Sequence, residues 1–253
     1  MVHKFLLGVL FSTILLNGQN VGATNVSAKS WLIADTNGNI VEQQNIHNIQ
    51  PIASITKLMT VMVVLDAGEN LNNSYVMKKF KTPVTRKEMI DLAIIHSDNQ
   101  AADMLCKLYI RGYHGCIEDM NKKAEELGMN NTIFYDSTGL DNRNVSNAND
   151  LLKLLQSAEK YNLITHASTK SSVSVIVPTK KKNKYYKWSF SNTNPLVSKY
   201  DMIVSKTGYV RASGGCMAVV ATINGEKKYF VVLNSKTTKT RVHDMETLFW
   251  LRT

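Results

Sequence analysis

Apolar and β-branched residues at the two ends of this chain alternate as they do in strands. Such runs predict strands at residues 30–35, 39–42, 202–206, 216–223 and 228–233. The pairs Asn37-Gly38 and Asn224-Gly225 lie between two of these runs in each half, and both residue types tolerate the positive φ of a tight hairpin. About five antiparallel strands are therefore expected from segments far apart along the chain.

The middle of the chain has a helical period instead. Residues 54–66 are apolar on nearly every side, as in a helix buried at the centre of a protein. Thr85 followed by Glu88 predicts a capping box that opens a helix through residue 95. Further helices are expected at residues 99–109, 116–127, 149–160 and 240–251. The prediction is an α+β fold in one domain, 24–253, with an all-helical lobe near 54–164 inserted into a sheet lobe near 24–53 and 165–253.

The first 23 residues have the pattern of an export signal. Lys4 gives the positive end, residues 5–16 are mostly apolar, and Val21-Gly22-Ala23 offers small residues for cleavage. We expect an exported, periplasmic protein with no stable membrane anchor after signal removal, the alternative being an uncleaved anchor. No cysteine precedes Cys106, which excludes a lipid-modified cysteine near the amino terminus.

Composition favours a folded, basic protein. The chain has 253 residues, of which 44% are hydrophobic, enough for a substantial core. Its formal charge of +10 suits contact with anionic polymers. The only segment that resembles a nucleic-acid surface is the lysine-rich run 180–184, followed by Tyr185, Tyr186 and Trp188. We interpret it as a solvated hairpin tip whose aromatic residues rejoin the fold, and expect no nucleic-acid partner.

The three cysteines leave at least one thiol unpaired. Cys106 and Cys116 are the only pair close in sequence, and a disulfide between them would close the 108–115 connection. Cys216 is expected to be a small buried strand residue. No cysteine or histidine grouping has metal-ligand spacing, so neither a metal nor a cofactor is expected.

Three short motifs carry the candidate chemistry: Ser54-Ile55-Thr56-Lys57, Ser97-Asp98-Asn99 and Lys206-Thr207-Gly208. Each is common alone. Ser157 and Lys160 also fit the first pattern, but they follow the second motif and fall in a stretch predicted to be an ordinary surface helix.

The first motif can supply a nucleophile and its base. Residues three apart share a helix face, so Ser54 and Lys57 project together. A hydroxyl needs an adjacent base to attack near neutral pH. Lys57 is such a base only if burial and neighbouring cations lower its pKa from about 10.4, and Lys206 could supply the repelling charge.

The other two motifs would complete the cleft. Ser97 could relay a proton and Asn99 could hold the substrate amide, while Asp98 would be structural. Lys206 and Thr207 on an edge strand would present a cation and a hydroxyl to a substrate carboxylate. Gly208 allows close approach of an extended peptide. Backbone N–H groups of Ser54 and Tyr209 are the expected oxyanion donors.

Together these residues resemble a known family. The matching segments are residues 51–60 (PIASITKLMT), 97–99 (SDN), 136–140 (DSTGL), 192–196 (NTNPL) and 205–209 (SKTGY). From about residue 30 to its end the chain resembles the low-molecular-mass penicillin-binding proteins, which are serine D-alanyl-D-alanine peptidases. It is most similar to their D-alanyl-D-alanine endopeptidase subgroup, the penicillin-binding protein 7 type, whose members have a single catalytic domain.

The resemblance implies a β-lactamase/transpeptidase-like fold and cleavage of D-alanyl-diaminopimelyl cross-links between peptidoglycan stem peptides through an acyl-Ser54 intermediate. It also implies that β-lactams acylate the same serine, and it gives Lys57 the role of base. Relatives often carry a hydroxyl two positions after Gly208, whereas Val210 stands here. Arg211 is therefore expected to help bind the substrate carboxylate.

Three other functions stay open. The closest is a D-alanyl-D-alanine carboxypeptidase acting on pentapeptide stems. A β-lactamase would need a second base for the deacylating water, and between residues 128 and 146 the only carboxylates are Asp136 and Asp141. The last is a catalytically silent wall-binding protein, which the presence of all motif residues disfavours.

Overall fold

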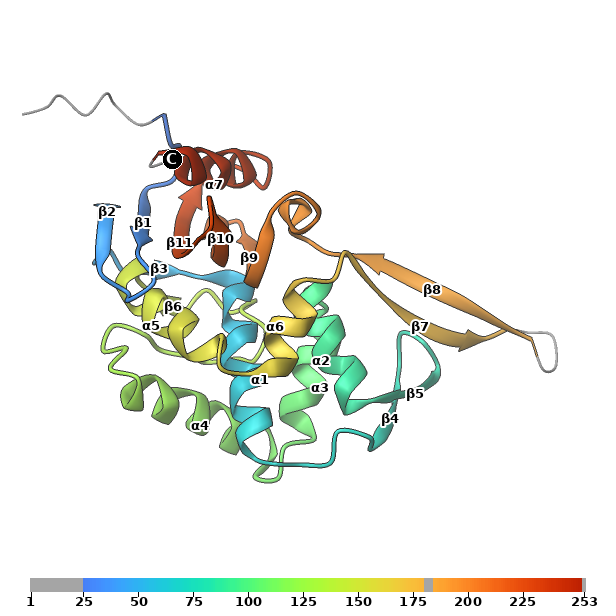
Figure 1. Cartoon of the computed structure of the whole chain (residues 1–253). Coiled ribbons are helices and arrows are strands. Elements are labelled where there is room, and N and C mark those ends of the chain that lie inside the picture. Colours follow the sequence, from blue (N-terminus) through green and yellow to red (C-terminus); the bar gives the residue numbers. More distant parts are fainter. Residues whose placement is uncertain (1–24, 180–183, 252–253) are drawn as a thin grey trace, which may run out of the picture.

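The computed structural model describes residues 25–179 and 184–251. The predicted export signal and most of the lysine-rich run lie outside the described residues. The predicted five-stranded antiparallel sheet is confirmed, with strand order β2-β1-β11-β10-β9. Its strands are β1 (Ser30–Ala34), β2 (Ile40–Gln44), β9 (Asp201–Val210), β10 (Gly214–Ile223) and β11 (Glu226–Ser235). Strands from both ends of the chain thus pair side by side (Figure 1).

Both faces of this sheet are covered. Helix α7 (Thr240–Trp250), predicted from the sequence, packs on one face, and the helical lobe packs on the other (Figure 1). Successive strand side chains point to opposite faces, so Trp31 and Phe230 contribute to the core under α7, whereas Leu32 and Val231 join the core of the helical lobe. The burial of both faces explains why β1, β10 and the middle of β11, residues 229–233, are mostly apolar.

The two predicted hairpin turns differ. Asn224 and Gly225 have φ of 53° and 80° and directly join β10 to β11, as expected for a two-residue turn. At the other pair only Gly38 has positive φ, at 86°. That connection is a longer loop in which the Asp35 carboxylate accepts hydrogen bonds from the backbone N–H groups of Asn37 and Asn39. The tight-turn prediction was therefore wrong there, because a side-chain acceptor organises a wider loop.

The helical lobe is built around α1, whose residues 56–64 are all buried, as predicted. Thr85 and Glu88 form the expected capping box at the start of α2. The helices are α1 (Thr56–Asp66), α2 (Arg86–Ile95), α3 (Asn99–Lys107), α4 (Gly112–Glu126), α5 (Ala148–Ala158) and α6 (Asn162–Ser168). The boundary predicted near residue 164 falls inside α6, which the sequence reading missed. Ser157 is buried in α5, which packs on the sheet, so that segment is not the surface helix that was predicted.

Three short strand pairs complete the fold. They are β3 (Gln50–Pro51) with β6 (Val145–Ser146), β4 (Ser74–Met77) with β5 (Thr82–Thr85), and β7 (Ser172–Pro178) with β8 (Tyr185–Ser191). The β7–β8 pair is a ribbon that projects from the body of the molecule (Figure 1). The prediction that its aromatic residues pack against the rest of the protein holds only in part. Trp188 contacts Phe80, whereas Tyr185 is 67% exposed.

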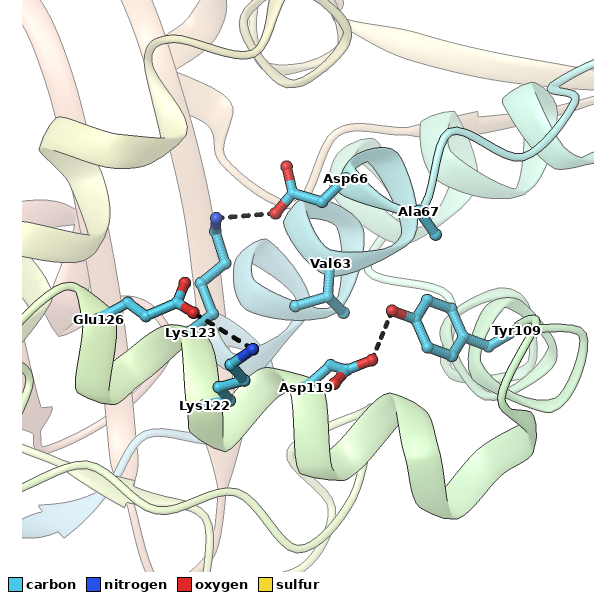
Figure 2. Close-up of a pocket in the computed structure, with 8 residues that line it drawn as sticks. All are labelled: Val63, Asp66, Ala67, Tyr109, Asp119, Lys122, Lys123 and Glu126. Carbon is cyan, nitrogen blue, oxygen red and sulfur yellow. Dashed lines mark hydrogen bonds and ion pairs between the residues drawn. The ribbon is translucent and has the colours of Figure 1, made fainter.

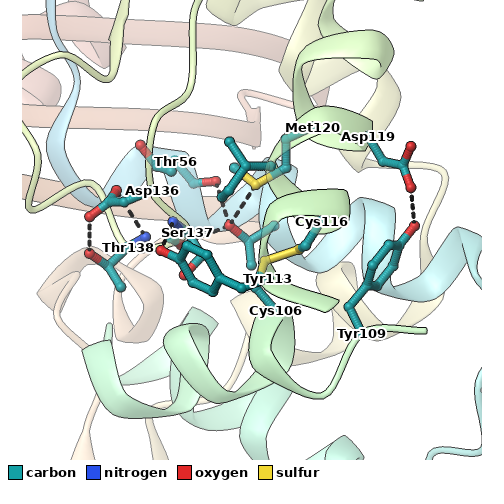
Figure 3. The surroundings of a disulfide bond; sticks show 12 residues. Thr56, Cys106, Tyr109, Tyr113, Cys116, Asp119, Met120, Asp136, Ser137 and Thr138 are labelled. Carbon is teal, nitrogen blue, oxygen red and sulfur yellow. Dashed lines mark hydrogen bonds between the residues drawn. A yellow bond between two sulfur atoms is a disulfide. The ribbon is translucent and has the colours of Figure 1, made fainter. Parts of the chain in front are cut away.

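The structure pairs Cys106 of α3 with Cys116 of α4 in a disulfide (Figure 3). Both cysteines are fully buried, and Cys216 is a buried free thiol in β10, as expected. The disulfide therefore joins two helices that both contact α1. Within residues 25–179 and 184–251, no helix is long and apolar enough to cross a membrane.

Candidate active site

Ser54 lies in a short 3-10 turn, η1 (Ala53–Ile55), that leads directly into α1. Two glycines approach this turn closely. A Cβ added at Gly139, where φ is +79°, would lie 1.9 Å from the carbonyl oxygen of Ala53. A Cβ added at Gly208 would lie 3.0 Å from the backbone nitrogen of Ser54. The turn that presents Ser54 is therefore held between the residue 139 loop and strand β9.

The amino group of Lys57 makes three hydrogen bonds in this site. Its Nζ atom lies 2.7 Å from Ser54 Oγ, 2.8 Å from Asn99 Oδ1 and 2.7 Å from the carbonyl oxygen of Thr138. The amide and backbone oxygens can only accept, so they take two N–H groups. The remaining direction of Nζ faces the Ser54 hydroxyl. A neutral amine held in this way points its lone pair at the nucleophile.

Burial lowers the pKa of Lys57 from 10.5 to about 7, against the opposing effects of Asp136 and Asp98. The sequence predicted that the charge of Lys206 would help to lower the pKa of Lys57. In the structure the repulsion lowers the pKa of Lys206 instead, which falls first because of burial and then because of the charges of Lys57 and Arg241. Lys57 thus has the lowered pKa that a general base requires, and burial rather than Lys206 is its leading cause.

The loop that supplies the Thr138 carbonyl is organised by Asp136. One carboxylate oxygen accepts hydrogen bonds from the backbone N–H of Gly139 and the side-chain amide of Asn144, and the other accepts from the Thr138 hydroxyl. Asn144 also donates to Thr56 Oγ1 at the start of α1. No role was predicted for this loop, although an Asp followed by Ser-Thr-Gly is typical of a turn organised by its own side chains.

Ser97 and Asn99 lie at the junction of α2 and α3. Ser97 has a φ of +59°, which turns the chain between the helices. Asp98 caps α3 by accepting from the N–H of Ala101, and it forms an ion pair of 2.7 Å with Lys79. These contacts fit the structural role predicted for Asp98. Ser97 instead faces Lys206, and Asn99 faces Lys57.

Strand β9 closes the other side of the site and is an edge strand of the sheet, as expected. Lys206 Nζ donates to Ser97 Oγ at 2.8 Å, and Thr207 Oγ1 donates to Thr193 Oγ1 at 2.6 Å. A cavity of about 190 Å³ opens here. Its lining residues are Ser54, Ser97, Thr193, Thr207, Gly208, Tyr209, Thr238 and Arg241. Segments distant in sequence therefore converge on one cleft.

Arg211 does not line this cavity. It is exposed in the turn after β9, whereas Arg241 of α7 is 7% exposed and reaches the cleft. The Nη1 atom of Arg241 donates to the carbonyl oxygen of Gly208 at 2.8 Å, and its buried Nε has no hydrogen-bond partner among the described residues. Arg241 was not predicted from the sequence, because nothing in the local pattern of α7 distinguishes a cleft-facing arginine from a solvated one.

A second cavity, of about 250 Å³, lies between α1 and α4 at the end of α1 opposite Ser54. Figure 2 shows that its polar side chains pair with one another: Lys123 with Asp66, and Tyr109 with Asp119. These contacts satisfy the groups that a ligand would use. The cleft at Ser54 is therefore the candidate active site.

Comparison with known proteins agrees with this geometry. A family model described as D-alanyl-D-alanine carboxypeptidase, peptidase family S11, matches residues 17–78 and 68–237. A D-alanyl-D-alanine endopeptidase of Escherichia coli K12 is 37% identical over 90% of this chain and 78% of its own length.

Two solved structures share the fold. The Streptomyces K15 DD-transpeptidase is 24% identical, with a TM-score of 0.82 over 89% of this chain and 97% of its own. Penicillin-binding protein D2 of Listeria monocytogenes, in its ampicillin-bound form, is 24% identical, with a TM-score of 0.77 over 90% of this chain and 98% of its own. The chain belongs to the D-alanyl-D-alanine carboxypeptidase family S11 and is a serine-type D-alanyl-D-alanine peptidase.

Proposed function

We propose that this protein is an exported endopeptidase that cleaves D-alanyl-diaminopimelyl cross-links of peptidoglycan through an acyl-Ser54 intermediate. The observation that carries the proposal is the position of Lys57 Nζ, 2.7 Å from Ser54 Oγ and held by two acceptor oxygens. The endopeptidase name of the E. coli relative supports the choice of bond.

In the acylation step, Lys57 takes the proton of Ser54 while the Ser54 oxygen attacks the carbonyl carbon of the D-alanyl residue. The backbone N–H groups of Ser54 and Tyr209 then stabilise the oxyanion, worth about 3 kcal/mol per donor. The tetrahedral intermediate then collapses, its C–N bond breaks, and the proton held by Lys57 passes through Ser97 to the leaving amine, which leaves Lys57 neutral. Ser97 lies 2.8 Å from Lys206 Nζ. Water afterwards hydrolyses the acyl-enzyme, with Lys57 again as base.

Substrate binding uses β9 and the residues beside it. Its edge can align an extended peptide, and Asn99 holds the substrate amide. Lys206, Thr207 and Arg241 present two cations and a hydroxyl to a carboxylate. Arg241 takes the place that was expected for Arg211, because it is the arginine that lines the cleft.

β-Lactams mimic the D-alanyl amide and are expected to acylate Ser54 and stay attached. The two carboxylates considered for activating a deacylating water are engaged elsewhere. Asp136 accepts hydrogen bonds from its own loop, and Asp141 pairs with Arg143. This arrangement favours a penicillin-binding peptidase over a β-lactamase, while carboxypeptidase action on pentapeptide stems remains the alternative.

The test uses wild type and Ser54→Ala side by side. A fluorescent penicillin should label only the wild type, and intact mass should show a stable adduct. Incubation with a purified cross-linked muropeptide dimer should give monomers in chromatography with mass detection. Loss of terminal D-alanine from a pentapeptide monomer, with the dimer left intact, would replace the endopeptidase assignment by a carboxypeptidase one.

A further inference from the structure

The β7–β8 ribbon carries a continuous row of aromatic rings on one face. Its register pairs Phe190 with Val173, Trp188 with Val175 and Tyr186 with Val177, and paired residues of an antiparallel ribbon share a face. The rings of Trp188 and Phe190 stack with centres 5.4 Å apart, and those of Tyr186 and Trp188 are 6.5 Å apart.

One end of this row lies beside the candidate active site. The Phe190 ring lies 4.7 Å from the ring of His96, the residue before Ser97. Lys79 Nζ lies 4.6 Å from the Phe190 ring centre and also forms the ion pair with Asp98. After β8 the chain leads directly to Thr193 in the cleft.

The far end of the row opens into a hollow of about 390 Å³ between the ribbon and the β4–β5 connection. Its lining residues are Lys79, Phe80, Lys81, Val177, Pro178, Thr179, Tyr186 and Trp188. Tyr186 is 48% and Trp188 37% exposed. The hollow thus combines the faces of accessible rings with two lysine side chains.

We propose that this ring-lined hollow binds the saccharide–peptide strand that carries the cross-link cleaved in the cleft. The inference rests on the proposed function and names a second contact with the same polymer. Sugar rings would stack on Trp188 and Tyr186, which offer flat apolar faces with a polar edge. Stem-peptide carboxylates would meet exposed Lys81, whereas Lys79 is already paired with Asp98. The formal charge of +10 also favours contact with an anionic polymer.

The position of the ring row next to the cleft favours the saccharide–peptide strand as the ligand of the hollow. A peptide bound along β9 continues into the polymer to which it is attached, and the ring row leads away from Thr193 and Ser97. A long substrate held at two places gains effective concentration at the second site without any change in the first. The ribbon should therefore affect polymeric substrate far more than a small one.

Tyr185 and Tyr186 provide a matched pair, because neighbouring strand residues point to opposite faces. Tyr186 lines the hollow, whereas Tyr185, which is 67% exposed, is not among its lining residues. The binding test uses the full chain carrying Ser54→Ala, which lacks the nucleophile and therefore should bind the polymer without cleaving it. In this background, retention on purified peptidoglycan sacculi should fall at least fivefold with Tyr186→Ser. It should change less than twofold with Tyr185→Ser. Trp188→Ala is a second variant, and thermal unfolding identifies any misfolded protein.

The enzyme with Ser54 intact gives the second readout. For Tyr186→Ser, the loss of kcat/KM on sacculi should exceed any change in penicillin acylation at least fivefold. A sugar-bearing muropeptide should compete for binding at least tenfold better than the same peptide without sugar. Equal retention of the two tyrosine variants would overturn the inference. So would a Tyr186-dependent attachment to phosphatidylglycerol vesicles, or to a second copy of the chain, with sacculus retention unchanged.

Failure of the proposed function would look different. In that case wild type would leave the muropeptide dimer intact, while retention of the Ser54→Ala protein on sacculi would still depend on Tyr186.

Discussion

The Nζ atom of Lys57 lies 2.7 Å from the Oγ atom of Ser54, and burial brings the pKa of this lysine down to about 7. Distance and proton affinity are both needed, since a protonated amine at the same distance only donates to the hydroxyl. The helix start brings the two side chains together, and the surrounding core lowers the proton affinity of the amine. The reactivity that we propose for Ser54 would thus depend on the packing around α1.

The first prediction concerns pH. With the neutral amine of Lys57 as the proposed base, the rate of Ser54 acylation should rise about tenfold per pH unit below pH 7 and level off above it. Second-order labelling by a fluorescent penicillin between pH 5 and 9 measures this profile. A rate that is already constant from pH 5 upward would mean that Lys57 is not the titrating base.

The second prediction concerns Asp136, whose negative charge raises the pKa of Lys57. Asp136→Asn removes that charge, so the acid limb of the acylation profile should move to lower pH. The maximal rate should also fall, because the Thr138 carbonyl loses part of its support. Asp141→Asn is the control on the same loop, since Asp141 pairs with exposed Arg143. Identical shifts in both variants would contradict a specific effect of Asp136.

Much of this site follows from local sequence, and some of it does not. Spacing on a helix is enough to place Ser54 beside Lys57, and the paired ends of the chain predict a sheet whose edge carries Lys206 and Thr207. Contacts between distant segments give no such local signal. The loop at Asp136 is recognisable as a turn, but its carbonyl contact with Lys57 arises only when α1 is packed against it.

Arg211 and Arg241 also show that contacts between distant segments cannot be predicted from local sequence. Proximity in sequence to Gly208 favoured Arg211, but the turn after β9 carries it into solvent. The packing of α7 against β10 and β11 brings Arg241, which is 33 residues beyond Gly208 in the sequence, to the cleft. Register and helix placement, rather than residue type, decide which arginine lines the cleft.

These two arginines give the third prediction. Arg241→Gln should reduce acylation by a carboxylate-bearing penicillin about 10- to 100-fold, the range expected for a charged hydrogen bond of about 1.5–3 kcal/mol. Arg211→Gln, its exposed counterpart, should change the rate less than twofold. Comparison with an esterified β-lactam separates carboxylate binding from general damage. A larger effect at Arg211 would restore the sequence-based expectation.

The fourth prediction concerns the glycine beside the nucleophile turn. Gly139→Ala should abolish acylation and lower the unfolding temperature, because its Cβ would lie 1.9 Å from the Ala53 carbonyl oxygen. Gly68 is the matched control, with a φ of +65° and, in the part of the chain that the structure describes, no atom within 4 Å of an added Cβ. Gly68→Ala should cost only the backbone penalty of about 1–2 kcal/mol and keep full labelling. Equal losses in the two variants would assign the effect to φ alone.

The last prediction concerns the disulfide. Cys106 and Cys116 are ten residues apart, and a closed loop of this size restricts the unfolded chain by about 2–3 kcal/mol. The double variant Cys106→Ala/Cys116→Ala should therefore lose roughly that much unfolding free energy in urea. Acylation of Ser54 should persist at 25 °C, since neither cysteine touches the cleft. Reductant should lower the unfolding midpoint of wild type and Cys216→Ala alike, and leave the double variant unchanged. A reductant effect that survives in the double variant would show that the stabilising bond lies elsewhere.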